Sequence, residues 1–212
     1  PDEPRSTDER IVESFEKYAD FATKNIGEWQ LYDVDNHTVY GFNEITFPGM
    51  GDRQAWTVFN YAKTTPASNV AWKGHTGDKV LISFGAPYAT TENWLVSPEL
   101  PGKAQTIAFW EKSFKGSDKE TYNLMYSTSG FNRSDFTALE MNHIVSDKWT
   151  EVEYNLPEGT KYFAVVASST DGFATLIDYI SFIPDSCAAQ QLTLVGYNIY
   201  RDGVKVNDTP VT

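Results

Sequence analysis

Hydrophobic and polar residues alternate in short runs along most of the chain, with turn-forming residues between the runs. Seven runs are rich in aromatic or β-branched residues and are separated by clusters of Gly, Pro, Asn and Asp. They span residues 56–61, 79–85, 106–114, 122–127, 150–156, 161–168 and 175–183. This rhythm is typical of β-sandwiches and barrels, so the chain is expected to be all-β.

Two of these runs also predict which side chains are buried. In the run 150–156, Val152, Tyr154 and Leu156 share one face and the glutamates share the other, which indicates a strand with one dry and one wet side. The segment 162–167 is almost continuously apolar, which predicts an inner strand covered on both faces.

The first 22 residues follow a different pattern. Residues 1–10 are charged and polar, which predicts a solvated lead-in. From Ile11 to Ala22 the apolar positions recur at helical spacing, and Ser6 and Glu9 have the spacing of a capping box. On periodicity alone, this segment is predicted to form a helix.

The composition of the chain changes again after Pro184. Residues 185–190 are small and polar and are predicted to be a linker. Within residues 191–212, Asp202 and Gly203 separate two strand-like runs, which is a strong signal for a β-hairpin. Because two strands alone are marginally stable, this fragment must pack on the main domain or belong to a module that is cut short here.

The net charge and the cysteine content limit the partners and the kinds of site that the chain can have. The formal net charge is −12, so the protein should repel nucleic acid and anionic lipid and attract cations. The sequence has no apolar stretch of about 18 residues, so no membrane insertion by this segment is expected. Cys187 is the single cysteine, which excludes an intrachain disulfide and a cysteine-based zinc site.

Several segments resemble the cleaved-adhesin family, which is related to the choice-of-anchor J modules of Bacteroidetes surface proteins. The segments, in the order of the family, are 13–16, Trp29 with 32–35, 93–100 with 107–110, 156–162 and 176–182. Together they place the resemblance at about residues 11–183. Residues 197–206 resemble the opening hairpin of the fibronectin-III-like modules that follow such domains.

The resemblance implies a jelly-roll-type β-sandwich over residues 11–184, followed by truncated fibronectin-III-like strands over residues 191–212. It places residues 13–16 in the first strand and the stretch down to Trp29 in a loop, which is the alternative to the helix predicted from periodicity. It also implies a secreted or bacterial outer-membrane protein that binds host proteins or glycans and works beside neighbouring modules of the same chain.

The resemblance further implies a calcium site where the first and last strands meet, formed by Glu16, Asp33, Asp35 and Asp178. Calcium binds six to eight oxygens and would tie the ends of the domain together. The sequence departs from the family pattern at His37, where relatives often have a third acid, and at Asp178, where some relatives have two acids. The alternatives are that Asp33 and Asp35 cap the amides of a turn, that Asp178 faces outward and that Glu16 is solvated.

Aromatic side chains supply the candidate ligand-binding residues. Most of them must belong to the core, because each buries a large area, but loop residues surround Trp72 and Tyr88, which are therefore candidates for exposed ring platforms. The three histidines, His37, His75 and His143, are isolated and are expected at the surface or in loops.

These observations predict a non-catalytic, calcium-stabilised adhesion or binding module. The chain lacks a nucleophile elbow, a zinc-protease motif and a Walker loop. Because a glycosidase needs only two well-placed carboxylates, an accessory or catalytic domain of a carbohydrate-active or proteolytic surface enzyme is an alternative. An architectural spacer between modules is the other alternative.

Overall fold

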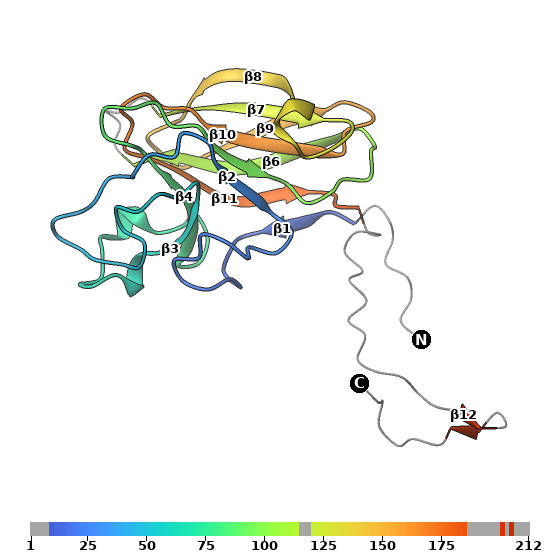
Figure 1. Cartoon of the computed structure of the whole chain (residues 1–212), viewed down its shortest axis with the longest axis horizontal. Helices are drawn as coiled ribbons and strands as arrows, with labels where there is room; N and C mark the ends of the chain where they lie inside the picture. Colours follow the sequence, from blue (N-terminus) through green and yellow to red (C-terminus); the bar gives the residue numbers. More distant parts are fainter. Residues whose placement is uncertain (1–8, 115–119, 186–199, 202–203, 206–212) are drawn as a thin grey trace.

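The computed structural model describes residues 9–114, 120–185, 200–201 and 204–205. Two antiparallel sheets stack as a jelly-roll β-sandwich, as predicted from the sequence (Figure 1). The first sheet contains β1 (Ile11–Glu13), β3 (Thr57–Asn60), β4 (Lys79–Phe84), β6 (Gln105–Ser113), β9 (Thr150–Leu156) and β11 (Ala174–Phe182). The second sheet contains β2 (Gln30–Asp33), β5 (Asn93–Val96), β7 (Thr121–Ser127), β8 (Thr137–Ile144) and β10 (Tyr162–Ala167).

The main core lies between the two sheets and follows from strand alternation. Along β6, every second residue is buried, from Gln105 to Ser113. In β9, Leu156 is buried and Val152 and Tyr154 are half-buried, whereas the glutamates are exposed, which confirms the predicted dry and wet faces.

The central strand of the second sheet, β10, is covered on both faces, as predicted. Phe163 and Val165 face the main core, and Ala164 and Val166 join Trp94 in a separate apolar cluster on the other face. The alternation of Phe163 to Val166 between two apolar environments explains why this strand has no polar face.

The helix predicted over residues 11–22 is not formed. β1 pairs with β11, and the chain then runs through turns in which Phe15 and Phe21 have φ angles of 60° and 61°. Positive φ is incompatible with a right-handed helix. Phe15, Tyr18 and Ala22 instead pack on the core from these turns, whereas Val12 is exposed. Pairing with β11 satisfies the backbone of Ile11–Glu13.

Helical structure in the described residues is limited to three short 3₁₀ turns, η1 (Tyr61–Lys63), η2 (Val70–Trp72) and η3 (Arg133–Asp135). None of these described helices is long and apolar enough to cross a membrane.

The predicted C-terminal hairpin is confirmed, because β12 (Tyr200–Arg201) pairs antiparallel with β13 (Val204–Lys205). Residues 1–8, 186–199 and 206–212 lie outside the described residues, and with them most of the predicted lead-in, the linker and Cys187. The domain boundaries and the likeness to a fibronectin-III-like module therefore stay predictions.

One edge of β11 positions the first candidate site. Along this edge β11 pairs with β4 over Ala174–Ile177 and with β1 over Ile180–Phe182. Asp178 and Tyr179 lie between the part of β11 that pairs with β4 and the part that pairs with β1. The register of β11 with β6 shifts just after Asp178. The end of β1 and the start of β4, which are distant in sequence, therefore lie beside Asp178 in the middle of β11.

Candidate functional site

Asp178 is fully buried and binds the loop that precedes β4. Its Oδ2 accepts hydrogen bonds from the backbone N–H of Thr76 at 2.8 Å and from the Thr76 hydroxyl at 3.3 Å, and its Oδ1 accepts one from the Tyr179 N–H at 2.7 Å. Burial raises the pKa of Asp178 to about 6; these hydrogen bonds oppose the rise, and the negative charge of Glu16 adds to it.

Glu16 approaches the same loop from the end of β1. Its Oε1 accepts a hydrogen bond from the backbone N–H of Lys79, the first residue of β4, at 2.7 Å. The structure therefore brings Glu16 and Asp178 together around the loop 74–79, at the place where the first and last strands of the sandwich meet.

Oxygen atoms crowd around Gly74 in this loop. A Cβ atom at position 74 would lie 2.7 Å from the carbonyl oxygen of Thr76 and 3.0 Å from Oδ2 of Asp178, and would overlap the carbonyl oxygen of Lys79. Hard cations such as calcium bind carboxylate and carbonyl oxygens of this kind. Within the described residues, however, no three Asp, Glu, His or Cys side chains form a group that could hold a metal. A cation here would need backbone carbonyls and water to complete its shell.

Asp33 and Asp35 do not join Glu16 and Asp178. Asp33, at the end of β2 in the other sheet, accepts a hydrogen bond from the Asn36 N–H at 2.7 Å, and Asp35 accepts bonds from the N–H groups of His37 at 2.9 Å and Glu92 at 2.6 Å. These bonds match the alternative in which both side chains cap a turn. The prediction that four carboxylates converge on one site is therefore corrected to two.

The two candidate ring platforms have opposite environments. Trp72 is only 5% exposed, and its ring stacks on Phe114 with a centroid distance of 3.5 Å, so the prediction of an exposed platform is wrong for this residue. Tyr88 is 95% exposed. Its N–H donates to Asp171, which also accepts a hydrogen bond from the Tyr40 hydroxyl, so the backbone that carries Tyr88 is held in place.

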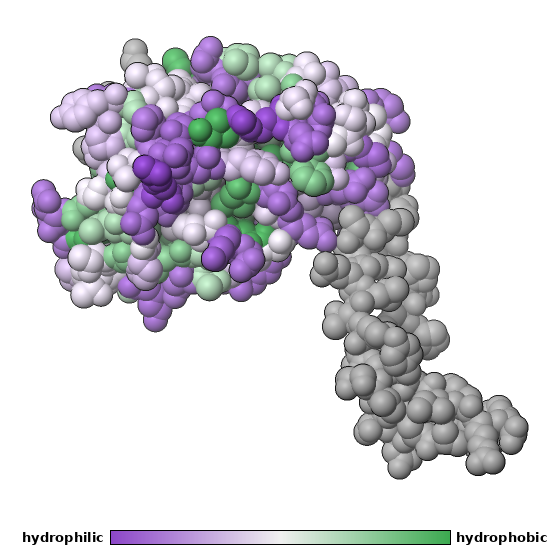
Figure 2. Space-filling model, viewed as in Figure 1, coloured by the Kyte–Doolittle hydropathy of each residue, from purple (hydrophilic) through white to green (hydrophobic). Residues whose placement is uncertain are grey.

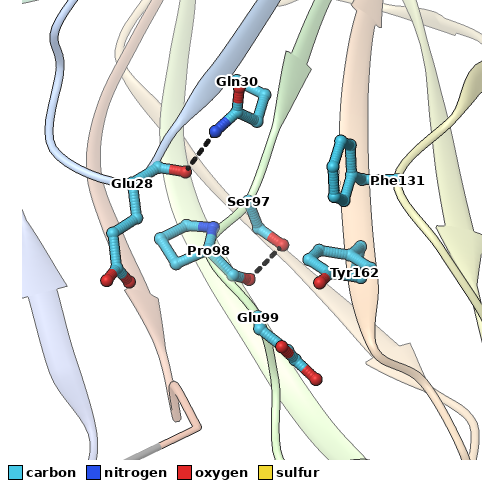
Figure 3. A pocket seen from close by; sticks show the side chains of 7 residues that line it. All are labelled: Glu28, Gln30, Ser97, Pro98, Glu99, Phe131 and Tyr162. Carbon is cyan, nitrogen blue, oxygen red and sulfur yellow. Dashed lines mark hydrogen bonds between the residues drawn. The ribbon is translucent and has the colours of Figure 1, made fainter. Parts of the chain in front are cut away.

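A second candidate site is a surface pocket of about 150 Å³ at one end of the second sheet (Figure 3). Figure 3 shows Glu28 and Gln30 on one side of the segment 97–99, and the rings of Phe131 and Tyr162 on the other. The sequence did not single out these residues, because they come from four separate segments and follow no common period.

His143 is not the isolated surface residue that the sequence predicted. It lies in β8, half-buried, where Nε2 is 2.9 Å from Oε1 of Glu111 and Nδ1 is 3.2 Å from Oε1 of Glu140. Glu111 is itself buried, on the inward face of β6. His75 is a loop residue, as expected, and its ring stacks on Trp110 at 3.7 Å.

The surface shows no single dominant apolar patch on the face in Figure 2. Hydrophobic side chains reach this face in small groups that are separated by hydrophilic ones (Figure 2). The candidate binding features of the protein are therefore local: an exposed ring at Tyr88, an oxygen-rich loop at Asp178 and the pocket beside Tyr162.

Comparisons with known proteins agree with this fold. The family description "Cleaved Adhesin Domain" matches residues 49–183. The K2 cleaved adhesin domain of Lys-gingipain is similar at 24% identity and a TM-score of 0.61, covering 82% of this chain and 99% of that domain. The K1 domain of Lys-gingipain from Porphyromonas gingivalis W83 is similar at 24% identity and a TM-score of 0.57, covering 82% and 96%. No curated protein sequence matches.

Proposed function

The chain belongs to the cleaved adhesin domain family, and we propose that it is an extracellular adhesion module that binds a host protein or a glycan and is not itself a catalyst. The observation that carries this proposal is the family match over residues 49–183 on a two-sheet sandwich. A secreted or outer-membrane location, beside other modules of one longer chain, is part of the same proposal.

Tyr88 is the proposed contact residue. An aromatic ring that is 95% exposed offers a large apolar face and a hydroxyl to a partner. Asp171 accepts a hydrogen bond from the Tyr88 N–H, whose backbone has a φ of 60°, so little backbone freedom remains to be lost at this residue when a partner binds.

Replacement of Tyr88 by alanine is expected to weaken binding at least about tenfold, because an aromatic contact at an interface contributes about 1.4 kcal/mol or more. The measurement is binding of the whole chain to a glycan array and to immobilised extracellular host proteins. Ile144→Ala, at a residue that is 63% exposed on β8, is the matched control and should leave binding unchanged.

Two results would overturn the adhesion proposal. Release of products from a polysaccharide or a protein would indicate an enzyme. Absence of binding to every array member, together with absence of products, would favour a spacer.

A calcium ion held by Glu16 and Asp178 completes the proposed module. The two carboxylates and the carbonyl oxygens of Thr76 and Lys79 are ligands of the type that calcium prefers, and they gather where the end of β1 and the start of β4 meet the middle of β11. Calcium bound there would hold the end of β1 against β11 and the start of β4. Its role in this proposal is structural.

Metal-free protein is expected to lose stability as the pH rises from about 4 to about 7, by up to about 3 kcal/mol from Asp178 alone. The folded-state pKa of Asp178 is about 6 and lies above the ordinary value of 3.8. The folded protein therefore binds the proton more tightly, and this stabilisation disappears as Asp178 ionises. Urea unfolding of wild type and Asp178→Asn at several pH values, with a chelator present, measures this pH dependence of the free energy of unfolding. The same pH dependence in both proteins would contradict the prediction.

A further inference from the structure

The pocket beside Tyr162 combines an apolar wall with polar groups that face it. Phe131 is 45% exposed, and its ring meets Tyr162 edge-on at a centroid distance of 5.7 Å. Pro98 is buried between this wall and Glu28 (Figure 3). An exposed ring that is fixed against a second ring presents an apolar face in a defined direction.

The polar groups of the pocket are placed to form hydrogen bonds with a ligand. The Gln30 amide nitrogen reaches the carbonyl of Glu28 at a long distance of 3.4 Å, so this amide is weakly engaged within the protein. Burial raises the pKa of Tyr162, and the nearby Glu99 carboxylate raises it further, so the Tyr162 hydroxyl keeps its proton. An apolar wall with a few convergent donors and acceptors is the usual composition of a small-molecule site.

The charges of the pocket select against anionic ligands. Glu99 is partly neutralised by Lys161 at 3.4 Å, whereas Glu28 forms no ion pair within the described part of the chain. The whole chain carries a net charge of −12, which adds to the repulsion of anions. A ligand for this pocket must therefore be neutral or cationic.

A second depression adjoins the first. It has a volume of about 280 Å³ and shares Glu28 and Pro98 with the pocket beside Tyr162. Its lining adds Tyr18 and Trp29, and the ammonium group of Lys17 lies over the Tyr18 ring at 5.0 Å. Because Lys17 already occupies that ring and pairs with Glu13 at 2.8 Å, a second cation is disfavoured there.

We infer that these two adjoining depressions form a binding site for a neutral oligosaccharide, with one sugar ring against Phe131 and Tyr162 and the next units running past Glu28 towards Tyr18. The hydroxyl groups of a neutral sugar match the carboxylate of Glu28 and the amide of Gln30, and its apolar C–H face matches the Phe131 ring. This inference rests on the proposed function as a binding module and assigns it a site distinct from Tyr88.

The test is titration of the whole chain with neutral oligosaccharides of glucose, galactose, mannose and xylose, followed by saturation-transfer NMR and calorimetry. Oligogalacturonate of the same length as the galactose oligomer serves as the acidic counterpart. Binding of at least one neutral oligomer is expected, and Phe131→Ala should weaken it about tenfold. Glu28→Gln should weaken it as well and should narrow the preference for the neutral over the acidic oligomer.

The control variant is Ile144→Ala, which shortens an exposed apolar side chain on β8 that lines neither depression and should leave this binding unchanged. Unchanged melting curves show that Phe131→Ala and Glu28→Gln remain folded. The inference is overturned if no neutral oligomer binds, if the acidic oligomer binds equally well, or if neither variant changes binding. If any of these results is found while another partner binds wild type and not Tyr88→Ala, the adhesion proposal stands and only the oligosaccharide site is refuted.

Discussion

Replacement of Trp29 by alanine is expected to lower the free energy of unfolding by about 3 to 5 kcal/mol. Trp29 is 5% exposed and links the two sheets, because its ring meets Phe163 of β10 at 5.9 Å and Phe182 of β11 at 5.6 Å, both edge-on. It also contacts Phe15, from the turn after β1, at 6.0 Å. Truncation would leave a cavity lined by three rings that belong to different elements and cannot all move inward together.

Chemical denaturation at a fixed calcium concentration measures this loss. Tyr88→Ala is the matched control, since it removes an aromatic ring that is 95% exposed, and it should change stability by less than about 0.5 kcal/mol. A loss below about 1.5 kcal/mol for Trp29→Ala would show that the contact between the sheets does not depend on this ring.

Most strands that carry a clear alternating or continuously apolar run were predictable from the sequence, and several short or irregular strands were not. The run 150–156 coincides with β9 because its alternation is uninterrupted. The seven predicted runs omitted β1, β2, β5 and β8, and β1 lies in the segment that periodicity assigned to a helix. β2 and β5 have four residues each, too few to establish a period, and β8 is an edge strand whose alternation is broken by register shifts against β7 and by Asn142 at a φ of 55°.

The candidate sites were predictable only in part, and the reason is physical. Glu16 and Asp178 were named because the resemblance to the cleaved-adhesin family implied acids where the first and last strands meet. The carbonyl oxygens of Thr76 and Lys79 were not, because every residue has a carbonyl and only the folded loop aligns them. Asp33 and Asp35 were misplaced because Asp suits both a metal site and a turn, and the hydrogen bonds of the turn decided between them.

Chelation of calcium at neutral pH is expected to lower the free energy of unfolding of the wild-type chain by about 4 kcal/mol. A site with a Kd of about 1 μM stabilises the folded state by about this amount at about 1 mM free calcium, because the metal binds the folded state and not the unfolded one. For a chain of this length, the corresponding fall in melting temperature is about 8 to 16 °C. Melting curves with calcium and with EGTA measure the difference.

Substitutions of the carboxylates identify the residues on which this sensitivity to calcium depends. Asp178→Asn and Glu16→Gln should each abolish it, because each removes a charged ligand from the loop 74–79, whereas Asp33→Asn should retain it, because Asp33 caps its own turn in the other sheet. Acidification below about pH 6 should also weaken calcium binding, since the proton competes for Asp178. Identical wild-type curves with and without EGTA would refute the calcium site, and loss of sensitivity in Asp33→Asn alone would move it to the end of β2.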